Sequence, residues 1–270
     1  IGQDDTLLFI TSNCFDLSVY DIFGILASGG KFVIARKEEI QDPEKLSDLM
    51  VKEKVTFWDS VPTTMNHLVN TLEESHADYL QEDLRLVFMS GDWIPVKLPD
   101  RLKKYFPNAQ VISLGGATEG TIWSIYYPIE EVGPFQTSIP YGRPLDNNFF
   151  YILDEDQNLV PRGVAGELYI GGVGVARGYM NNKEKTAASY FPDKFIETRG
   201  GRMYRTGDLG RMLPDGNIEF LGRKDHQVKI RGFRVELGEI ENTLLKYQEI
   251  KETVVVDQID ESGTKFLCAY

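Results

Sequence analysis

Two glycine-containing segments carry residue types that suit a nucleotide ligand. Residues 113–119, Ser-Leu-Gly-Gly-Ala-Thr-Glu, place two adjacent glycines before a hydroxyl and a carboxylate. Adjacent glycines let a backbone approach a phosphorylated ligand closely, and a hydroxyl with a carboxylate can hold Mg²⁺ beside phosphate oxygens. Residues 204–209 place Asp208 in a glycine turn, where a carboxylate can accept hydrogen bonds from both ribose hydroxyls. The guanidinium of Arg223 carries several N–H donors that can bind phosphate. Taken alone, each segment is also an ordinary turn.

Two further segments are open to a structural and a functional interpretation. Residues 166–178 are rich in glycine, but no helix follows them directly, which favours loops that shape a sheet over a phosphate site. Residues 227–241 join a basic strand to a helix with an acidic face. That strand is either a solvated edge, whose Lys229, Arg231 and Arg234 resist pairing with other sheets, or a mobile element that faces phosphate.

Composition excludes several classes of protein. The chain has 270 residues, enough for about two domains. Its net charge of −12 argues against proteins that bind nucleic-acid backbones or membrane surfaces through basic patches. The two cysteines lie far apart and none of the three histidines belongs to a nucleophile or metal pattern, so a disulfide framework, a structural zinc site and a hydrolase are not expected. A reducing cytoplasm fits best, and no apolar run approaches the roughly 20 residues of a membrane span.

The elements that must position these residues predict an α/β chain in three parts. Alternating strands and amphipathic helices over residues 1–125 predict the end of a large parallel α/β subdomain. Short strands between glycine and proline turns predict a β-barrel subdomain over 126–222, and residues 223–270 predict a hinge and the start of a small α+β C-terminal subdomain. The expected strands of the first part cover residues 6–11, 31–35, 55–58, 84–89 and 110–114, and the expected helices cover 43–51, 63–72 and 98–106.

Five motifs in fixed order closely resemble those of the adenylation domain of nonribosomal peptide synthetases. They cover residues 15–18, 115–119, 166–178, 204–209 and 222–232, so the resemblance spans almost the whole chain. It implies that ATP activates an amino acid to an aminoacyl-AMP, which is then transferred to the phosphopantetheine thiol of a peptidyl carrier protein. A condensation or cyclisation domain of the same synthetase is a further implied partner. Neither a nucleic acid nor a membrane is expected as a partner.

The resemblance also implies roles for single residues. It assigns nucleotide binding to Gly115, Gly116, Ala117, Thr118, Asp208, Phe220 and Arg223. Within this set, Thr118 contacts phosphate and Asp208 holds the ribose hydroxyls, while the neighbouring Glu119 holds Mg²⁺. Asp225 falls at the family's hinge, where the C-terminal part rotates between adenylation and thioester formation. Lys229, on the loop 227–232 that reaches the site afterwards, becomes a candidate for the thioester stage.

Residues 15–18 resemble the start of the family's amino-acid pocket. Asp16 pairs with the substrate α-ammonium on this resemblance, which suits an α-amino acid. The remaining lining is Leu17, Tyr20, Asp59, Phe88, Ser90, Leu114, Ile122 and Trp123. This set is similar to the pockets of cysteine-activating domains, except that Asp59 stands where an amide is expected and Phe88 where a smaller aliphatic residue is expected. A buried carboxylate is costly unless it is paired or protonated, so Asp59 also leaves a hydroxyl or basic substrate side chain open beside the favoured cysteine.

Other functions stay open at this point. An aryl or acyl-CoA ligase of the same superfamily would share the nucleotide motifs but has no use for Asp16, and a catalytically silent docking scaffold would keep the fold alone. The phosphate loop and the terminal Asn-Gly-Lys motif of the family are not found in these residues. We therefore expect a fragment that forms little adenylate by itself, with an inserted tailoring domain after residue 270 as one possibility.

Overall fold

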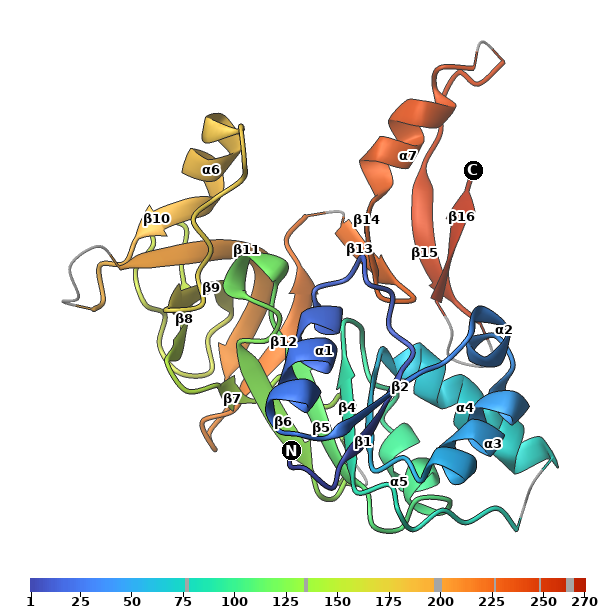
Figure 1. The fold of residues 1–270 in the computed structure, drawn as a ribbon. Helices are drawn as coiled ribbons and strands as arrows, with labels where there is room; N and C mark the ends of the chain where they lie inside the picture. Colours follow the sequence, from blue (N-terminus) through green and yellow to red (C-terminus); the bar gives the residue numbers. More distant parts are fainter. Residues whose placement is uncertain (76–77, 134–135, 197–200, 226, 248, 261–264) are drawn as a thin grey trace.

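The computed structural model describes residues 1–270 with the exception of 76–77, 134–135, 197–200, 226, 248 and 261–264. Three parts follow one another along the chain (Figure 1): a large sheet with helices, a second sheet beside it, and a C-terminal part that projects away from both. None of the helices in the described ranges combines the length and the apolar character that crossing a membrane requires.

The large sheet has seven strands in the order β2-β1-β3-β4-β5-β6-β7. The strands are β1 (Thr6–Phe9), β2 (Lys31–Ile34), β3 (Phe57–Ser60), β4 (Leu86–Ser90), β5 (Gln110–Gly115), β6 (Ile125–Ile129) and β7 (Arg143–Pro144). The first five are parallel, as the alternation of strands and helices predicts, and each lies within a few residues of its expected range. The sheet then continues past residue 125, because β6 pairs antiparallel with β5, and β7 with β6. A sheet of purely parallel strands is therefore too narrow a description of this part.

Each face of the large sheet has its own core. Leu8 and Trp58 pack into the larger core, whereas their strand neighbours Leu7 and Phe57 pack with Ile25 on the opposite face. The larger core lies under α3 (Pro43–Glu53), α4 (Pro62–Ser75) and α5 (Leu98–Lys103), with the short α2 (Lys37–Ile40) beside them, and the other face lies under α1 (Leu17–Ala27).

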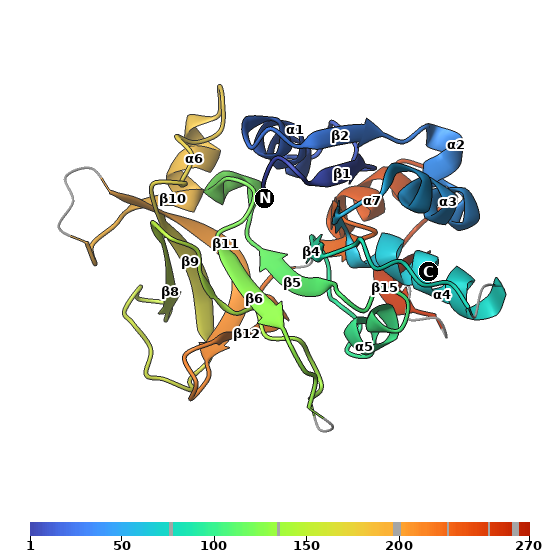
Figure 2. The same ribbon diagram turned by 60° about the horizontal axis from the view of Figure 1, so that its bottom comes forward.

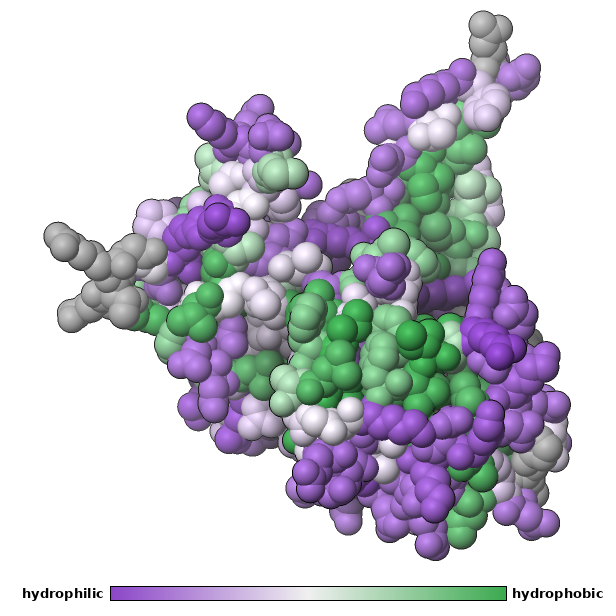
Figure 3. Space-filling model, viewed as in Figure 1, coloured by the Kyte–Doolittle hydropathy of each residue, from purple (hydrophilic) through white to green (hydrophobic). Residues whose placement is uncertain are grey.

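Helix α1 is absent from the sequence prediction, and its burial pattern gives the reason. Its large apolar residues Val19, Phe23 and Leu26 point outward and are 49, 68 and 56% exposed, while Ser18 and Asp21 are buried. A periodicity argument looks for an apolar face toward the core, and this helix places Ser18 and Asp21 there beside Ile25. Figure 3 shows the resulting apolar patch over α1 and β2.

The second sheet contains five antiparallel strands. They are β8 (Asn148–Leu153), β9 (Gly166–Gly172), β10 (Tyr190–Pro192), β11 (Arg202–Met212) and β12 (Ile218–Arg223). Their order is β10-β11-β9-β8, with β12 also paired to β11. The expected barrel is thus an open sheet over the residues described, since the strand pairs there do not close a ring. Figure 2 shows this sheet beside β5 and β6 of the first, and α6 (Lys183–Ser189) lies at its edge.

A β-bulge in β11 sets up the site. The register of β11 against β9 shifts between Arg205 and Leu209, and the register against β12 shifts between Leu209 and Gly210. Bulges redirect side chains, and Asp208 lies inside this irregular stretch. Gly207 has a φ of 76°, a left-handed conformation that glycine adopts without strain.

The C-terminal part contributes a hairpin and a small α+β unit. The hairpin consists of β13 (Gln227–Ile230) and β14 (Phe233–Glu236), joined by Arg231 and Gly232 with φ values of 52° and 81°. Two central residues with positive φ form the tight turn that matches strand twist. Helix α7 (Leu237–Leu244), β15 (Val255–Ile259) and β16 (Lys265–Ala269) follow, and β15 pairs only with β16 among the described residues.

Candidate active site

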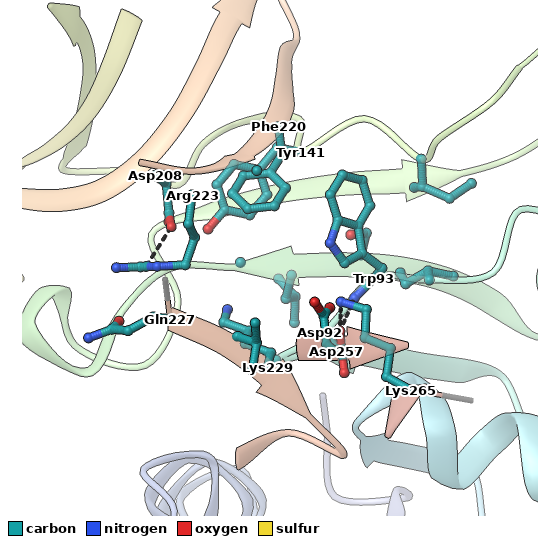
Figure 4. Close-up of a pocket in the computed structure, with 18 of the residues that line it drawn as sticks. Asp92, Trp93, Tyr141, Asp208, Phe220, Arg223, Gln227, Lys229, Asp257 and Lys265 are labelled. Atoms are coloured by element: carbon teal, nitrogen blue, oxygen red, sulfur yellow. Dashed lines mark hydrogen bonds and ion pairs between the residues drawn. The ribbon is translucent and has the colours of Figure 1, made fainter. Parts of the chain in front are cut away.

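Two adjoining cavities open where the large sheet, the second sheet and the hairpin meet. The first encloses about 260 Å³. Residues that line both cavities are Gly91, Gly115, Asp208, Arg223, Gln227, Val228 and Lys229. They come from the ends of β4 and β5, from the bulge of β11, from β12 and from the hairpin, so every part of the chain contributes. The shared lining makes the two cavities neighbouring parts of one site, and Figure 4 shows the first of them.

A carboxylate pair around one arginine forms one wall. Arg223 Nη1 donates to Asp208 Oδ1 at 2.7 Å, and Arg223 Nε donates to Asp225 Oδ1 at 2.6 Å. Burial raises the pKa of Asp208, although Lys229 and Arg223 oppose that shift. The two carboxylates act in the opposite sense on Arg223 and keep its pKa above the ordinary value despite burial. Asp225, the expected hinge residue, therefore also fixes the guanidinium that faces the cavity.

Aromatic rings beside Asp208 and Arg223 form a further part of the lining of the first cavity. Phe220 lies with its ring centroid 5.6 Å from that of Tyr141 and 4.9 Å from that of Trp93 (Figure 4). A Cβ added at Gly115 would lie 1.9 Å from Cε2 of Tyr141, so only glycine fits there. A planar ligand can stack on these rings, and Asp208, which lines the same cavity, can make polar contacts with it.

Lys229 enters the site from β13. It lines both cavities, and burial lowers the pKa of its ammonium, with Asp208 and Asp92 opposing that shift. At the far end of the first cavity, Lys265 Nζ of β16 lies 3.6 Å from Asp92 Oδ1. Figure 4 shows Lys265 and Asp92 together with Asp257. The C-terminal part is thus in direct contact with the site.

Glu119 lies behind the second cavity in the 3₁₀ turn Thr118–Gly120. Its carboxylate accepts from the Tyr179 hydroxyl at 2.7 Å, and Arg234 Nη1 of β14 lies 3.3 Å from Oε1. Burial raises the pKa of Glu119, but the Tyr179 hydrogen bond and the Arg234 charge outweigh burial, and the pKa is lower than usual. Over the described residues there is no cluster of three or more candidate metal ligands. A single carboxylate fits Mg²⁺ when phosphate oxygens and water supply the other ligands.

Some residues of the expected amino-acid pocket line the second cavity, and the others are packed outside its lining. Those expected residues that line the second cavity are Asp16, Leu17, Ser90, Ile122 and Trp123. The ring centroid of Tyr20 lies 4.8 Å from that of Trp123, and Phe88 completes the aromatic cluster at 5.5 Å from Trp123. Tyr20, Phe88, Asp59 and Glu119 are outside the lining of both cavities, while Leu114 lines the first. The fold therefore brings most, but not all, of the residues expected in the amino-acid pocket into the linings of the two cavities.

Ile122 has a backbone that is unusual for its type. Its φ is 62° and that of Thr121 is 67°. A left-handed conformation is a true outlier for β-branched residues, and such outliers cluster at functional sites. Thr121 Oγ1 donates to the carbonyl of Gly174 at 2.5 Å, which fixes this turn. The glycine-rich segment 166–178 thus supports the pocket through β9 and the following loop, in line with its structural interpretation.

Buried polar atoms without a hydrogen-bond partner gather around the same pocket. Within the described ranges such atoms belong to five residues, and four of them are Asp21, Asp59, Ser90 and Trp123. Native proteins leave few buried polar atoms unpaired, and each one needs an explanation. A bound ligand that supplies the missing partners is one.

Several residues of the site are missing from the sequence prediction. They are Asp21, Asp92, Trp93, Tyr141, Tyr179, Arg234 and Lys265, of which only Arg234 lies in a segment with an open functional interpretation. Asp92 and Trp93 follow β4 after Gly91, and the carboxyl ends of parallel strands are where ligands bind in such sheets. That rule is a signal by which both residues can be found. The other five depend on long-range packing.

Comparison with known proteins gives consistent matches. A family model described as AMP-binding enzyme matches residues 1–180. Bacitracin synthase 1 of Bacillus licheniformis is 50% identical over 270 residues, which are 100% of this chain and 5% of that protein. The nonribosomal peptide synthetase FmoA3 in its α-methyl-L-serine-AMP bound form gives a TM-score of 0.77 at 42% identity, over 89% of this chain and 26% of that one. An NRPS protein containing adenylation and PCP domains, bound to a vinylsulfonamide inhibitor, gives a TM-score of 0.87 at 26% identity, over 99% of this chain and 45% of that one.

Proposed function

The chain belongs to the AMP-binding enzyme family, and on that premise we propose that it serves in an adenylation domain of a nonribosomal peptide synthetase. In this proposal an α-amino acid reacts with ATP to give an aminoacyl-AMP and pyrophosphate, and the aminoacyl group then passes to the phosphopantetheine thiol of a peptidyl carrier protein. The observation that carries the proposal is the shared lining of the two cavities. Asp208, Arg223 and Lys229 lie between a cavity with an aromatic wall and a cavity that contains Asp16.

The first cavity is the proposed nucleotide site. The adenine lies against the rings of Phe220 and Tyr141, and Asp208 accepts from the ribose hydroxyls. Arg223 already donates to Asp208 and has a position from which it reaches phosphate oxygens. The backbone of Gly115, Gly116 and Ala117, with Thr118, leads from this cavity into the second. The aminoacyl-AMP-bound form of the similar synthetase FmoA3 supports this choice of ligand.

The second cavity is the proposed amino-acid site. Asp16 pairs with the α-ammonium group, and the side chain of the substrate points toward Ser90 and Trp123. Aromatic rings around a small polar pocket suit a thiol, because sulfur packs favourably at ring edges. L-Cysteine is therefore the proposed substrate.

Glu119 and the hairpin support two stages of the reaction. For adenylation, Glu119 is the proposed ligand of Mg²⁺, which neutralises phosphate charge when it is bound. Arg234 of the hairpin contacts Glu119, and Lys229 of the hairpin lines both cavities. We take this position of the hairpin as the one that serves the thioester stage. Rotation about Asp225 exchanges the two arrangements.

Partners and location are part of the same proposal. The similar protein that contains adenylation and PCP domains supports a carrier protein as the acceptor partner. A condensation or cyclisation domain and a tailoring domain after residue 270 are proposed on the resemblance alone. Both cysteines, Cys14 and Cys268, are free, which supports a location in the reducing cytoplasm.

Pyrophosphate exchange with a panel of amino acids tests the function. The 270 residues are placed within a whole adenylation domain, and we expect exchange that depends on L-cysteine and is abolished by Asp16→Ala. Exchange with an aryl or fatty acid instead, unaffected by this substitution, favours the acyl ligase. If no acid supports exchange and a non-hydrolysable cysteinyl-AMP mimic does not bind, the docking scaffold is favoured.

A further inference from the structure

We propose that the ion pair between Lys265 of β16 and Asp92 is a latch that holds the C-terminal part against the large sheet. We call the arrangement in which this pair is formed the docked arrangement. Lys265 is a positioning residue in this proposal, because it acts through Lys229, which the docked C-terminal part places in the two cavities. The proposal rests on the function proposed above, since the stage that the latch serves is transfer of the aminoacyl group to the carrier protein.

The ion pair is largely shielded from solvent. Lys265 Nζ lies 3.6 Å from Asp92 Oδ1, and the two side chains are 18% and 7% exposed. Removal of one partner leaves the other charge buried without its ion-pair partner, which costs more than the loss of an exposed pair. The pair therefore gives the docked arrangement a stability that depends on both residues.

Strand pairing turns Lys265 toward the site. Lys265 is the register partner of Ile259, and Asp257 lies two residues before Ile259 in β15, so the three side chains share one face of the β15–β16 pair. Asp257 and Lys265 line the first cavity. Ile259 and Lys265 line a third cavity, of about 380 Å³. This face of the C-terminal part therefore lies against the large sheet, with Lys265 at both cavities.

Asp92 is held from the side of the large sheet. Its Oδ1 accepts a hydrogen bond from the backbone N–H of Trp93 at 2.8 Å, and the ring of Trp93 packs on that of Phe220. Asp92, Trp93 and Ile94 line the third cavity as well as the first. The ion pair thus lies at the junction of these two cavities, where Asp92 offers the C-terminal part a fixed point of attachment.

The positive charges that act on Asp92 come from the C-terminal part. Burial raises the pKa of Asp92, and Lys265 of β16 and Lys229 of β13 oppose that shift. Rotation of the C-terminal part about Asp225 moves both lysines away from Asp92 together, because both follow Asp225 in the chain. The ion pair is then specific to the docked arrangement. An interaction made in only one of two arrangements shifts the equilibrium between them.

Lys229 is the residue through which the latch acts. It belongs to β13, a neighbour of β16 in the fold, and it lines the first and the second cavity. Figure 4 shows Lys229 and Lys265 beside Asp92 and Asp257. Attachment of β16 to Asp92 therefore keeps Lys229 in the site. Because Lys229 is the residue proposed for the thioester stage, the latch favours carrier loading over adenylation.

The test measures two rates, carrier loading and pyrophosphate exchange, on a whole adenylation domain with its carrier protein. Lys265→Ala lowers the ratio of loading to exchange by about tenfold, because the docked arrangement becomes less populated. Lys265→Arg keeps a cation that reaches Asp92 and holds the ratio within about threefold of the wild-type value. Lys251→Ala is the matched control, because Lys251 is an exposed lysine of the same part and lines none of the three cavities.

A double-mutant cycle shows whether the two residues act as a pair. Asp92→Asn lowers the same ratio, and the double variant D92N/K265A lowers it no further than Lys265→Ala does, since the interaction is already lost. Effects of the two single variants that multiply in the double variant overturn the latch.

Amide hydrogen exchange provides a readout without activity. In K265A, protection falls in β13 as well as in β16, because the latch holds both strands in the docked arrangement. A merely structural role of Lys265 within the β15–β16 pair predicts faster exchange in those two strands alone. Faster exchange confined to β15 and β16 therefore overturns the proposal.

The outcomes separate the latch from the proposed function. Exchange that depends on an amino acid, with an unchanged loading ratio in K265A, overturns the latch and leaves the adenylation function in place. Weaker AMP binding of K265A in calorimetry, again with an unchanged ratio, makes Lys265 a nucleotide ligand and also overturns the latch. No exchange with any amino acid in the wild type overturns the proposed function, whereas hydrogen exchange still reports whether Lys265 holds the C-terminal part.

Discussion

Arg234 Nη1 of the hairpin lies 3.3 Å from Oε1 of Glu119, a residue 115 positions earlier in the chain. The Glu119 side chain is 10% exposed, and the other close partner of its Oε1 is the Tyr179 hydroxyl. The proposed Mg²⁺ ligand is thus held by a cation from the C-terminal part. On the proposed function, Mg²⁺ binding at Glu119 and docking of the hairpin would compete for this carboxylate.

Replacing Arg234 by alanine is expected to loosen the hairpin. The charge-assisted contact with buried Glu119 is lost, so amide hydrogen exchange of the β13–β14 strands becomes faster by about tenfold. This factor is kept modest because Arg234 is partly exposed, and solvent weakens ion pairs of exposed groups. Hydrogen-exchange mass spectrometry measures this change, with Arg211→Ala at the exposed Arg211–Glu219 pair as the control. Unchanged protection of the hairpin in R234A would contradict the competition.

Lys229→Ala is expected to separate the two stages. Carrier loading falls on the order of 10²-fold, the usual effect of removing one preorganised charge, while pyrophosphate exchange changes little. Both rates are measured on a whole adenylation domain with its carrier protein. Lys224→Ala is the matched control, because the Lys224 side chain is half exposed, pairs with Glu155 and Glu167, and lines neither cavity. Equal losses in both rates would argue against a role limited to the thioester stage.

Asp208→Ala is expected to weaken AMP binding. The substitution removes the proposed ribose acceptor and leaves Arg223 with Asp225 as its remaining carboxylate partner. We expect a loss of affinity on the order of tenfold or more in calorimetry, because an unpaired hydroxyl and a displaced arginine both cost binding energy. Asp215→Asn in the β11–β12 turn is expected to bind AMP as the wild type does. Wild-type affinity in D208A would remove Asp208 from the nucleotide site.

Asp5 gives a prediction about acid stability. It accepts hydrogen bonds from Arg85 and Thr56 and from the backbone of Gly2, which ties together the starts of three strands. Burial raises its pKa, but these hydrogen bonds outweigh burial and lower it to about 2. The folded pKa is below the unfolded value of about 3.9, so this stabilisation is present above pH 4 and is lost as the pH falls toward 2.

Urea unfolding of the wild type and Asp5→Asn tests this contribution. At neutral pH the variant is expected to unfold with a free energy about 1–2 kcal/mol lower, a value discounted for the half-exposed Arg85. The difference between the two proteins shrinks between pH 4 and pH 2. A difference that stays constant over that range would show that Asp5 acts through packing alone.

Much of the fold follows from local patterns in the sequence. Strand-length apolar runs that alternate with amphipathic segments predict the parallel part of the large sheet. A layer of strands covered by helices buries the apolar strands and the apolar faces of the helices together. The same patterns fail for α1, whose buried face holds Ser18 and Asp21. They also give no sign that β6 and β7 extend the first sheet, since pairing partners are set by tertiary structure.

The sequence by itself determined which segments carry nucleotide-binding chemistry and in what order they occur, because glycine turns, Asp208 and Arg223 are local signals. Only the tertiary structure decided that Arg234 meets Glu119, that Lys265 meets Asp92 and that Asp21 of α1 is buried near Asp59 of β3. These contacts join residues from different parts of the chain. Their charge states depend on burial and on neighbours, and both exist only after the sheets, the helices and the hairpin have packed together.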